Sequence, residues 1–353
     1  MTYNQANLST IPFAYQECDN VFFDCALDLF MQLRSGHIGK YIYESANSSY
    51  QKSDEHVWLD VVENNKTYYL PSQDNNLLHK AHKGLVDLVP EGTPIVDFGV
   101  GETSAFYQNI LPILTHLESA DYYGIDCCQR YLEAIKEIGP KLTDAKIHAI
   151  NADFFSEEID IVAPHPSLGI MLCSTIGNLE GTIREKTIDT NLVHVLRILS
   201  RTTNHGWMLM SVDMSHEKDA LMAGYVTPAV EKFVLNVFHR AAKELPMKGF
   251  DPSLFRYTPE WIPENQLFAH IAEATETQNF QLGDYQLQVQ KGQKLHLLNS
   301  YKFSAPFFES CCDKANLDVL QVWDHESPMK LYLLKDRANT LSATTDELVS
   351  SVA

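Results

Sequence analysis

Basic residues are scarce in this sequence relative to acidic ones. It contains 27 Lys and Arg against 46 Asp and Glu, which gives a formal net charge of −19 at pH 7. A field of that sign repels polyanions unless a local basic cluster overcomes it, and the sequence holds no such cluster. We therefore expect it to bind neither nucleic acid nor an anionic membrane surface.

Long hydrophobic runs are also missing. No stretch reaches the roughly 18 apolar residues that suggest a membrane-spanning helix, and the N-terminus lacks the basic start and apolar run of a signal peptide. The composition, with 45% hydrophobic and 21% charged residues, is ordinary for a soluble globular enzyme. We expect a cytoplasmic monomer.

Disulfide and metal-ligand patterns are absent as well. The seven cysteines are odd in number, include two adjacent pairs and form no Cys-x-x-Cys motif, so neither a disulfide framework nor a zinc site is indicated. His79 and His82 stand three residues apart without a third ligand at a suitable spacing, which is more typical of an exposed helical face. We expect no metal site.

Between residues 73 and 213, short apolar runs alternate with amphipathic stretches of helical length. This alternation is typical of an α/β fold, in which crossover helices cover a parallel sheet. The expected strands are Pro94–Gly99, Tyr122–Asp126, Lys146–Asn151, Leu168–Cys173 and Trp207–Asp213. The expected helices are Ser104–His116, Gln129–Ile138 and Thr182–Leu199. A helix in residues 302–316, followed by strands at Val319–Trp323 and Leu331–Leu334, would complete the sheet.

The rest of the chain suggests a second domain. Residues 1–72 are rich in aromatics, and residues 214–300 combine a helical segment at Ala220–Leu245 with β-like runs around Leu267–Thr275 and Tyr285–Ser300. We expect residues 1–72 and 214–300 to form a substrate-binding domain. Residues 73–213 and 301–336 would form the α/β domain, followed by a flexible tail at 337–353.

A glycine-rich turn follows the first expected strand. In PIVDFGVGETS, Asp97 is followed by Gly99 and Gly101. Glycines at the C-terminal edge of a strand let a ligand approach the backbone closely, and the Asp97 carboxylate can meet a cationic or amino group of that ligand. The dinucleotide pattern GxGxxG is incomplete, because Ser104 occupies the position of its last glycine.

Two more acidic residues stand at the ends of the next strands. Asp126 ends YYGID, where a carboxylate can accept hydrogen bonds from both hydroxyls of a ribose. Asp153 offers a carboxylate to an adenine amino group, and Phe154 offers an aromatic face to its ring. Three acidic strand ends suit the sulfonium and amino group of S-adenosylmethionine better than the phosphates of NAD. We therefore expect S-adenosylmethionine as the cofactor.

Residues Ser174–Asn178 read STIGN, within the longer run MLCSTIGNL. With this motif, the chain resembles the histidine-specific α-N-methyltransferases of ergothioneine biosynthesis and their relatives that methylate other amino acids. The resemblance extends from about residue 40 to residue 334. It implies a Rossmann-like methyltransferase domain with a second, substrate-binding domain. It also assigns these residues to the cofactor: Gly99, Gly101, Asp126, Asp153 and Phe154.

Three further segments carry the resemblance to substrate-binding residues. KYIYES is similar to the family's KWFYDA, which implies that Tyr43 lies at the substrate's amino group, in the catalytic position. TYYLPSQ is similar to EYYPTRT, so Tyr68 would line the amino-acid pocket. GYVTPAVEKF is similar to AYDDAAGVTARF, so Tyr225 would join Asn178 on the substrate carboxylate. Neutral donors of this kind can hold a carboxylate without a competing cation.

The segment LLNSYKF departs from the family's pattern. Histidine-specific members hold the imidazole with a Glu and a Ser two residues apart, whereas Leu298 takes the Glu position here and Ser300 is kept. A buried imidazole N–H without its partner costs about 1–3 kcal/mol, so tryptophan, tyrosine or a derivative is favoured over histidine. Ala269 is expected to widen the pocket. Cys173, at a small-residue position of the family, would either crowd the methyl path or simply pack.

The sequence thus predicts an enzyme that methylates the nitrogen of a small amino-acid substrate, aromatic rather than histidine. Histidine is the alternative within the class. Two other classes stay open: an NAD-linked oxidoreductase, and a protein that binds the cofactor without turnover. His270 and His296 are further candidates to reach the substrate.

Overall fold

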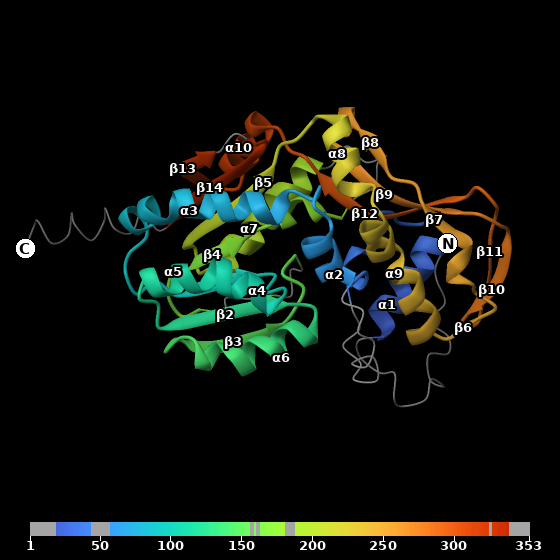
Figure 1. Ribbon diagram of the computed structural model, residues 1–353, viewed down its shortest axis with the longest axis horizontal. Helices are drawn as coiled ribbons and strands as arrows, with labels where there is room; N and C mark the ends of the chain where they lie inside the picture. Colours follow the sequence, from blue (N-terminus) through green and yellow to red (C-terminus); the bar gives the residue numbers. More distant parts are fainter. Residues whose placement is uncertain are drawn as a thin grey trace, which may run out of the picture.

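The computed structural model describes residues 19–43, 57–155, 159, 163–180, 188–324 and 327–338. Its central feature is a seven-stranded sheet with the strand order β13-β14-β5-β4-β1-β2-β3 (Figure 1). The strands are β1 (Ile95–Phe98), β2 (Asp121–Asp126), β3 (Lys146–Asn151), β4 (Leu168–Met171), β5 (Trp207–Asp213), β13 (Leu317–Asp324) and β14 (Met329–Asp336). β1 to β5 are parallel, while β14 runs antiparallel to β5 and β13. The expected α/β fold is confirmed.

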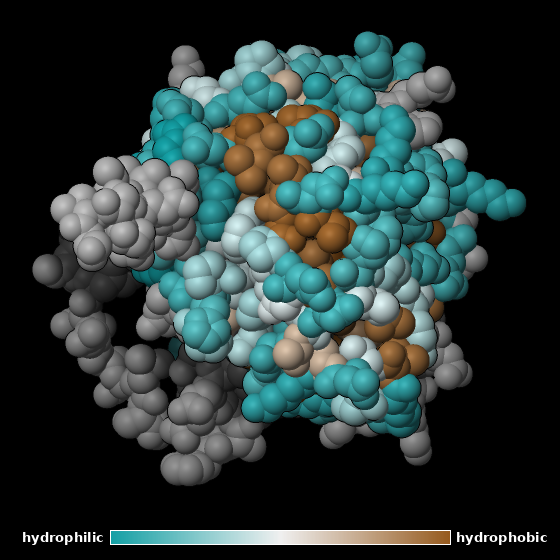
Figure 2. All heavy atoms as spheres, turned by 90° about the vertical axis from the view of Figure 1, so that its left-hand side faces the viewer, coloured by the Kyte–Doolittle hydropathy of each residue, from teal (hydrophilic) through white to brown (hydrophobic). Residues whose placement is uncertain are grey.

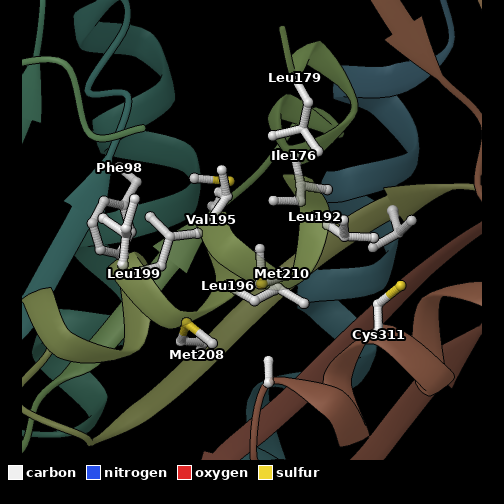
Figure 3. Packing of buried hydrophobic residues seen from close by; sticks show 14 of the residues in the cluster. Phe98, Ile176, Leu179, Leu192, Val195, Leu196, Leu199, Met208, Met210 and Cys311 are labelled. Atoms are coloured by element: carbon white, nitrogen blue, oxygen red, sulfur yellow. The ribbon is translucent and has the colours of Figure 1, made fainter. Parts of the chain in front are cut away.

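Helices cover both faces of this sheet, which explains why its central strands are largely apolar. Successive residues of β5 enter different cores: Leu209 packs with α3 on one face, and Met208 and Met210 pack with α7 on the other. Figure 3 shows Leu192, Leu196 and Leu199 of α7 against these methionines. The helices around the sheet are α3 (Leu70–Leu88), α5 (Leu111–His116), α6 (Gln129–Ile138), α7 (Ile188–Thr202) and α10 (Ala305–Lys314).

Two of the expected helices differ in detail. The helix expected at Ser104–His116 is divided into α4 (Thr103–Ala105), a π-helical turn η4 (Phe106–Ile110) and α5. The expected start of α7 at Thr182 lies outside the described residues, which resume at Ile188. Short 3-10 helices occur at η5 (Gly139–Lys141) and η6 (Thr175–Asn178).

A second group of elements lies on the right of Figure 1, beyond the C-terminal ends of the parallel strands. Its strands form two small antiparallel sheets, β11-β10-β6 and β12-β9-β7, with β8 paired to β9. Their bounds are β6 (Met247–Lys248), β7 (Phe255–Tyr257), β8 (Glu260–Ile262), β9 (Leu267–Ala274), β10 (Gln278–Leu282), β11 (Tyr285–Val289) and β12 (Lys294–Tyr301). The helices of this group are α1 (Asp19–Phe30), η1 (Gly39–Tyr41), α2 (Val57–Leu59), η3 (Asp60–Asn64), α8 (Lys218–Tyr225), α9 (Pro228–Glu244), η7 (Pro252–Leu254) and η8 (Pro263–Asn265).

Two single segments expected in this group are in fact divided. The helical segment Ala220–Leu245 breaks into α8 and α9, because Pro228 has no N–H to continue the first helix and instead begins the second. Thr227 caps α9 by accepting a hydrogen bond from the Val230 N–H (3.4 Å). The β-run Tyr285–Ser300 turns at Gly292, where φ is 79°, and so forms the two strands β11 and β12. The boundaries of the two domains stay a prediction, and residues 339–353 of the expected tail lie outside the described residues.

Among the described residues, no helix combines the length and the apolar character needed to cross a membrane. Figure 2 shows the face at the left of Figure 1, where hydrophilic residues predominate around a central hydrophobic patch.

Candidate active site

The C-terminal ends of β1 and β4 lie side by side where the strand order of the sheet reverses. Ligands of open α/β sheets bind at such a point. Gly99 and Gly101 follow β1 with φ values of 97° and 61°, which a residue with a Cβ rarely adopts. The buried Asp97 carboxylate accepts a hydrogen bond from the Tyr122 hydroxyl (2.7 Å). Burial raises the pKa of Asp97 to about 7, although this hydrogen bond lowers it.

Asp126, the last residue of β2, is tied to the glycine turn. Its Oδ2 accepts a hydrogen bond from the Gly101 N–H (3.2 Å), and its Oδ1 accepts one from the Cys128 N–H (2.7 Å). Burial raises the pKa of this carboxyl group, and the backbone donors oppose the shift. These bonds hold the end of β2 and the turn after β1 in one arrangement.

Asp153 is paired within the protein. Its Oδ2 lies 2.9 Å from Nζ of Lys40, and its Oδ1 accepts a hydrogen bond from the Phe155 N–H (3.0 Å). Asp153 lines a neighbouring cavity that also contains Lys40, whereas Phe154 lines both that cavity and the one at β1. The contact of Asp153 with an adenine amino group therefore stays a prediction. Such a contact would have to share the Asp153 carboxylate with Lys40.

The cavity at β1 brings together five of the six residues expected at the cofactor: Asp97, Gly99, Gly101, Asp126 and Phe154. None of the described residues lining it is Lys or Arg, the side chains that commonly bind phosphates. Its carboxylates instead suit amino and hydroxyl groups, and Val100, Ile110 and Leu172 supply apolar surface. These residues fit S-adenosylmethionine, which carries positive charge and no phosphate.

The STIGN segment forms a tight turn directly after β4. Cys173 and Ser174 both have positive φ values, 54° and 53°, a conformation that costs about 1–3 kcal/mol for such residues. Hydrogen bonds hold it: the Cys173 N–H donates to the Asp74 carboxylate, and Ser174 Oγ accepts from the Asp213 N–H (3.0 Å). Gly177 is needed because a Cβ there would lie 2.7 Å from the Tyr301 carbonyl oxygen. The turn thereby places Asn178 at the end of η6.

A second cavity lies beyond this turn. It brings together all six residues that the sequence assigns to catalysis and substrate binding: Tyr43, Tyr68, Asn178, Tyr225, Leu298 and Ser300. The two cavities share four lining residues, namely Tyr43, Trp58, Cys173 and Thr175. A ligand in one cavity therefore lies next to a ligand in the other, with these four side chains at the junction.

A chain of polar contacts runs along one wall of the second cavity. The Ser300 hydroxyl lies 3.4 Å from Asn178 Oδ1 and 3.1 Å from Nε2 of His270. The other ring nitrogen of His270 lies 2.7 Å from the Tyr257 hydroxyl. Burial lowers the pKa of His270 to about 3, so this histidine is neutral at physiological pH and serves as a hydrogen-bonding group.

A buried ion pair lies at the same wall. Nζ of Lys302 is 2.7 Å from Oδ2 of Asp213 and donates a hydrogen bond to the Tyr225 hydroxyl at 2.7 Å. The side chains of Lys302 and Asp213 are only 1% and 0% exposed. The Tyr69 hydroxyl also donates to Asp213 Oδ2 (2.6 Å). Lys302 also lines this cavity, so a cation accompanies the neutral donors that the sequence named for a carboxylate.

Another part of the lining of this cavity is aromatic. The Tyr43 ring meets the rings of Trp58 and Phe233 at centroid distances of 5.8 and 5.2 Å, and Trp58 meets Tyr68 at 6.0 Å. Arg240 fixes the position of Tyr43, since its Nη1 donates to the Tyr43 carbonyl oxygen at 2.7 Å. Trp58 and Phe233 are lining residues that sequence reasoning missed. Trp58 belongs to no recognisable motif, and Phe233 ends the segment GYVTPAVEKF, from which only Tyr225 was assigned to the site.

Two expectations about β9 and β12 need correction. Ala269 does not line the second cavity but packs in the core around α7, and its neighbour His270 faces the cavity instead. Side chains of adjacent strand residues point to opposite faces, so a shift of one residue decides which of them lines the site. His296 is not among the residues lining this cavity, which leaves His270 as the histidine within reach of a substrate.

Residues 47–336 match the family described as histidine-specific methyltransferase, SAM-dependent. The uncharacterized protein y4iF of Sinorhizobium fredii is 28% identical over 250 residues, which cover 69% of this chain and 81% of that protein. The N-methyltransferase imqF of Aspergillus flavus is 21% identical over 273 residues, covering 74% and 73%. Among solved structures, an S-adenosylmethionine-dependent methyltransferase from Clostridium acetobutylicum aligns with a TM-score of 0.41 and 10% identity, over 80% of this chain and 96% of that one.

The family match covers most of the chain, including the residues that line the two cavities, except Tyr43. The expected resemblance and the expected cofactor are thereby confirmed. The chain belongs to this family of methyltransferases, and S-adenosylmethionine is its methyl donor.

Proposed function

We propose that the protein methylates the amino nitrogen of a free amino acid, and that it prefers an aromatic side chain to that of histidine. The main observation is the second cavity, which is lined by both polar and aromatic side chains and meets the cofactor cavity at Tyr43 and Cys173. The cofactor supplies an electrophilic methyl group. The protein's own residues bind the acceptor, orient its nitrogen and exclude water.

The polar wall is suited to the acceptor's carboxylate. The amide N–H of Asn178 and the hydroxyl of Tyr225 are donors within one cavity. Burial raises the pKa of Tyr225, with Lys302 opposing the shift, so the hydroxyl keeps its proton and stays a donor. A buried carboxylate needs several such donors to replace the water that it loses.

Tyr43 is proposed to orient the acceptor's nitrogen. It lines both cavities, and its backbone is held by Arg240. A hydroxyl at this junction can hold the amine with its lone pair directed toward the methyl group. In-line transfer needs the unprotonated amine, and we assign no general base among the described residues.

The aromatic preference rests on Leu298 and the wall around Trp58. Leu298 lines the second cavity without a hydrogen-bonding group, so an imidazole N–H directed at it would lose its partner. An indole or phenol ring instead gains apolar contact with Trp58, Phe233 and Tyr68. Histidine is the second candidate, because Ser300 and the neutral His270 can still bind a polar ring.

The test is to incubate the protein with S-adenosylmethionine and free amino acids, and to identify methylated products by mass spectrometry. Methylation of tryptophan or tyrosine in preference to histidine supports the proposal. Preference for histidine contradicts the proposed role of Leu298 in specificity, but it agrees with an amino-acid N-methyltransferase. Cofactor binding without any product across the panel contradicts the proposal and favours a protein that binds the cofactor without turnover. An NAD-linked oxidoreductase is not proposed, because the family uses S-adenosylmethionine.

A further inference from the structure

Lys302 is a charged side chain placed where solvent cannot reach it. It is 1% exposed, its ammonium group contacts Asp213 and Tyr225, and it lines the second cavity. Burial lowers the pKa of Lys302, but Asp213 and Tyr225 outweigh that effect and raise it overall. The side chain is therefore a permanent cation in the wall of the acceptor site.

The hydrogen bond between Lys302 and Tyr225 has only one possible direction. An ammonium group has no lone pair and can only donate, so the Tyr225 oxygen must be the acceptor in this bond. The single O–H hydrogen of Tyr225 is thereby left to point elsewhere. Without Lys302, the same hydroxyl could turn and donate to a neighbouring acceptor in the wall.

Asp213, the negatively charged partner of Lys302, accepts hydrogen bonds from several donors. Asp213 Oδ2 accepts from Tyr69 as well as from Lys302, and Asp213 Oδ1 accepts from the Ser215 N–H at 3.0 Å. Each donor withdraws some of the negative charge of Asp213 from the cavity. The electrostatic potential at Tyr225 is consequently more positive than a simple one-to-one ion pair would give.

From this arrangement we propose that Lys302 is a positioning residue that selects acceptors bearing a free carboxylate. It acts through Tyr225, by fixing that hydroxyl as a donor to the carboxylate and by supplying the nearby positive charge. The inference rests on the proposed function and deepens it. The acceptor is then a carboxylate-bearing amine, and the corresponding decarboxylated amine is rejected.

The chemistry of burial gives the reason for this selectivity. A carboxylate that enters a closed cavity loses its hydration, and a charge-assisted hydrogen bond compensates for more of that loss than a neutral one. A decarboxylated amine brings only positive charge, which Lys302 repels. The same residue therefore favours one class of acceptor and disfavours the other.

The experiment compares the binding of L-tryptophan and tryptamine to the complex with S-adenosylhomocysteine, by calorimetry. Removing Lys302 alone would leave Asp213 buried and unpaired, so the variant is the double substitution Lys302→Met with Asp213→Asn, which removes both charges. Lys335→Met is the control, because Lys335 lies over the Trp207 ring and does not line the second cavity. The affinity for S-adenosylhomocysteine checks the fold of each variant.

We expect the wild type and Lys335→Met to bind tryptophan at least about tenfold more tightly than tryptamine. In the double variant this ratio should fall below about threefold, while the affinity for S-adenosylhomocysteine is unchanged. Adding Tyr225→Phe to the double variant should change the ratio little further, because Lys302 acts through the contact of Tyr225 with the carboxylate. L-tyrosine with tyramine, and L-histidine with histamine, serve as second and third probe pairs.

An unchanged ratio in the double variant overturns the role of Lys302 and leaves the proposed function intact. A wild type that binds none of the three amino acids overturns the proposed function, and the role of Lys302 with it. If the double variant loses S-adenosylhomocysteine binding as well, Tyr225→Phe alone decides: retention of the full ratio contradicts the inference, and its loss supports it.

Discussion

Nζ of Lys40 lies 2.9 Å from Oδ2 of Asp153, and this contact joins segments 113 residues apart in the sequence. Lys40 belongs to η1, just before Tyr43, while Asp153 follows β3 and precedes Phe154. The segment that carries Tyr43 is therefore attached to the loop that borders the cofactor cavity.

This contact allows the predicted adenine role of Asp153 to be tested. Asp153→Ala should weaken S-adenosylmethionine binding by about tenfold or more, because a hydrogen bond to a charged group is lost. Lys40→Met should change it by less than about threefold, since both side chains are partly exposed and their pair is a weak one. Calorimetric titration of each variant measures both values. Equal losses in the two variants would mean that Asp153 serves to anchor Lys40 and does not contact the cofactor.

Cofactor binding should depend on pH through Asp97. Burial raises the pKa of Asp97 to about 7, so its carboxyl group is largely protonated below that pH in the free protein. The amino group of S-adenosylmethionine is bound best by the ionised form. Binding should therefore weaken as the pH falls through about 7, by up to about tenfold per pH unit.

The matched variant for this pH effect is Asp97→Asn, which cannot ionise. Its affinity for S-adenosylmethionine should be lower than that of the wild type at about pH 8 and nearly constant down to about pH 6. A pH profile that keeps its slope in this variant would assign the titration to another group.

Asn178 should affect the acceptor and not the cofactor. Asn178→Ala removes a donor from the second cavity and should raise the KM for the acceptor by about tenfold or more, or abolish activity. The affinity for S-adenosylmethionine should stay within about twofold, because Asn178 does not line the cavity at β1 that contains Asp97 and Asp126. Steady-state kinetics and calorimetry provide the two readouts, with the exposed Asn279→Ala on β10 as a control. Equal losses for acceptor and cofactor would rule out the carboxylate role.

Leu298 should control the choice between histidine and aromatic acceptors. Leu298→Glu places a carboxylate where an imidazole N–H could donate, and it should raise kcat/KM for histidine relative to tryptophan by about tenfold or more. Leu298→Met conserves the volume without adding charge and should leave the preference within about twofold. Competition assays with both amino acids measure the ratio. If the two variants behave alike, Leu298 does not face the acceptor's side chain.

The cofactor edge was predictable because its residues are close to strand ends in the sequence. Asp97, the glycines after it, and Asp126 each lie within a few residues of the C-terminal end of a parallel strand. Parallel strands place these ends at one edge of the sheet, so a local pattern is enough to predict that they meet. The ion pair of Asp153 with Lys40 required knowledge of a distant segment, as did the presence of Tyr43 and Trp58 in the lining of the cavity at β1.

The acceptor site was less accessible to sequence reasoning, because it is assembled from distant segments. Tyr43, Asn178 and Tyr225 could be named only through the resemblance to a family. Ala269 and His270 are neighbours on β9, yet Ala269 packs in the core and His270 lines the cavity. An error of one residue in assigning the strand therefore names the wrong side chain. Trp58 had no motif at all to mark it.

The sequence by itself determined the parallel sheet, the glycine turn with its acidic strand ends, and therefore the cofactor, because these depend on local periodicity and on chain direction. Only the tertiary structure decided that Lys302 is buried against Asp213 and beside Tyr225. The charge of a lysine is evident in any sequence, but its burial and its partner depend on the packing of α8, β5 and β12, which no local pattern specifies.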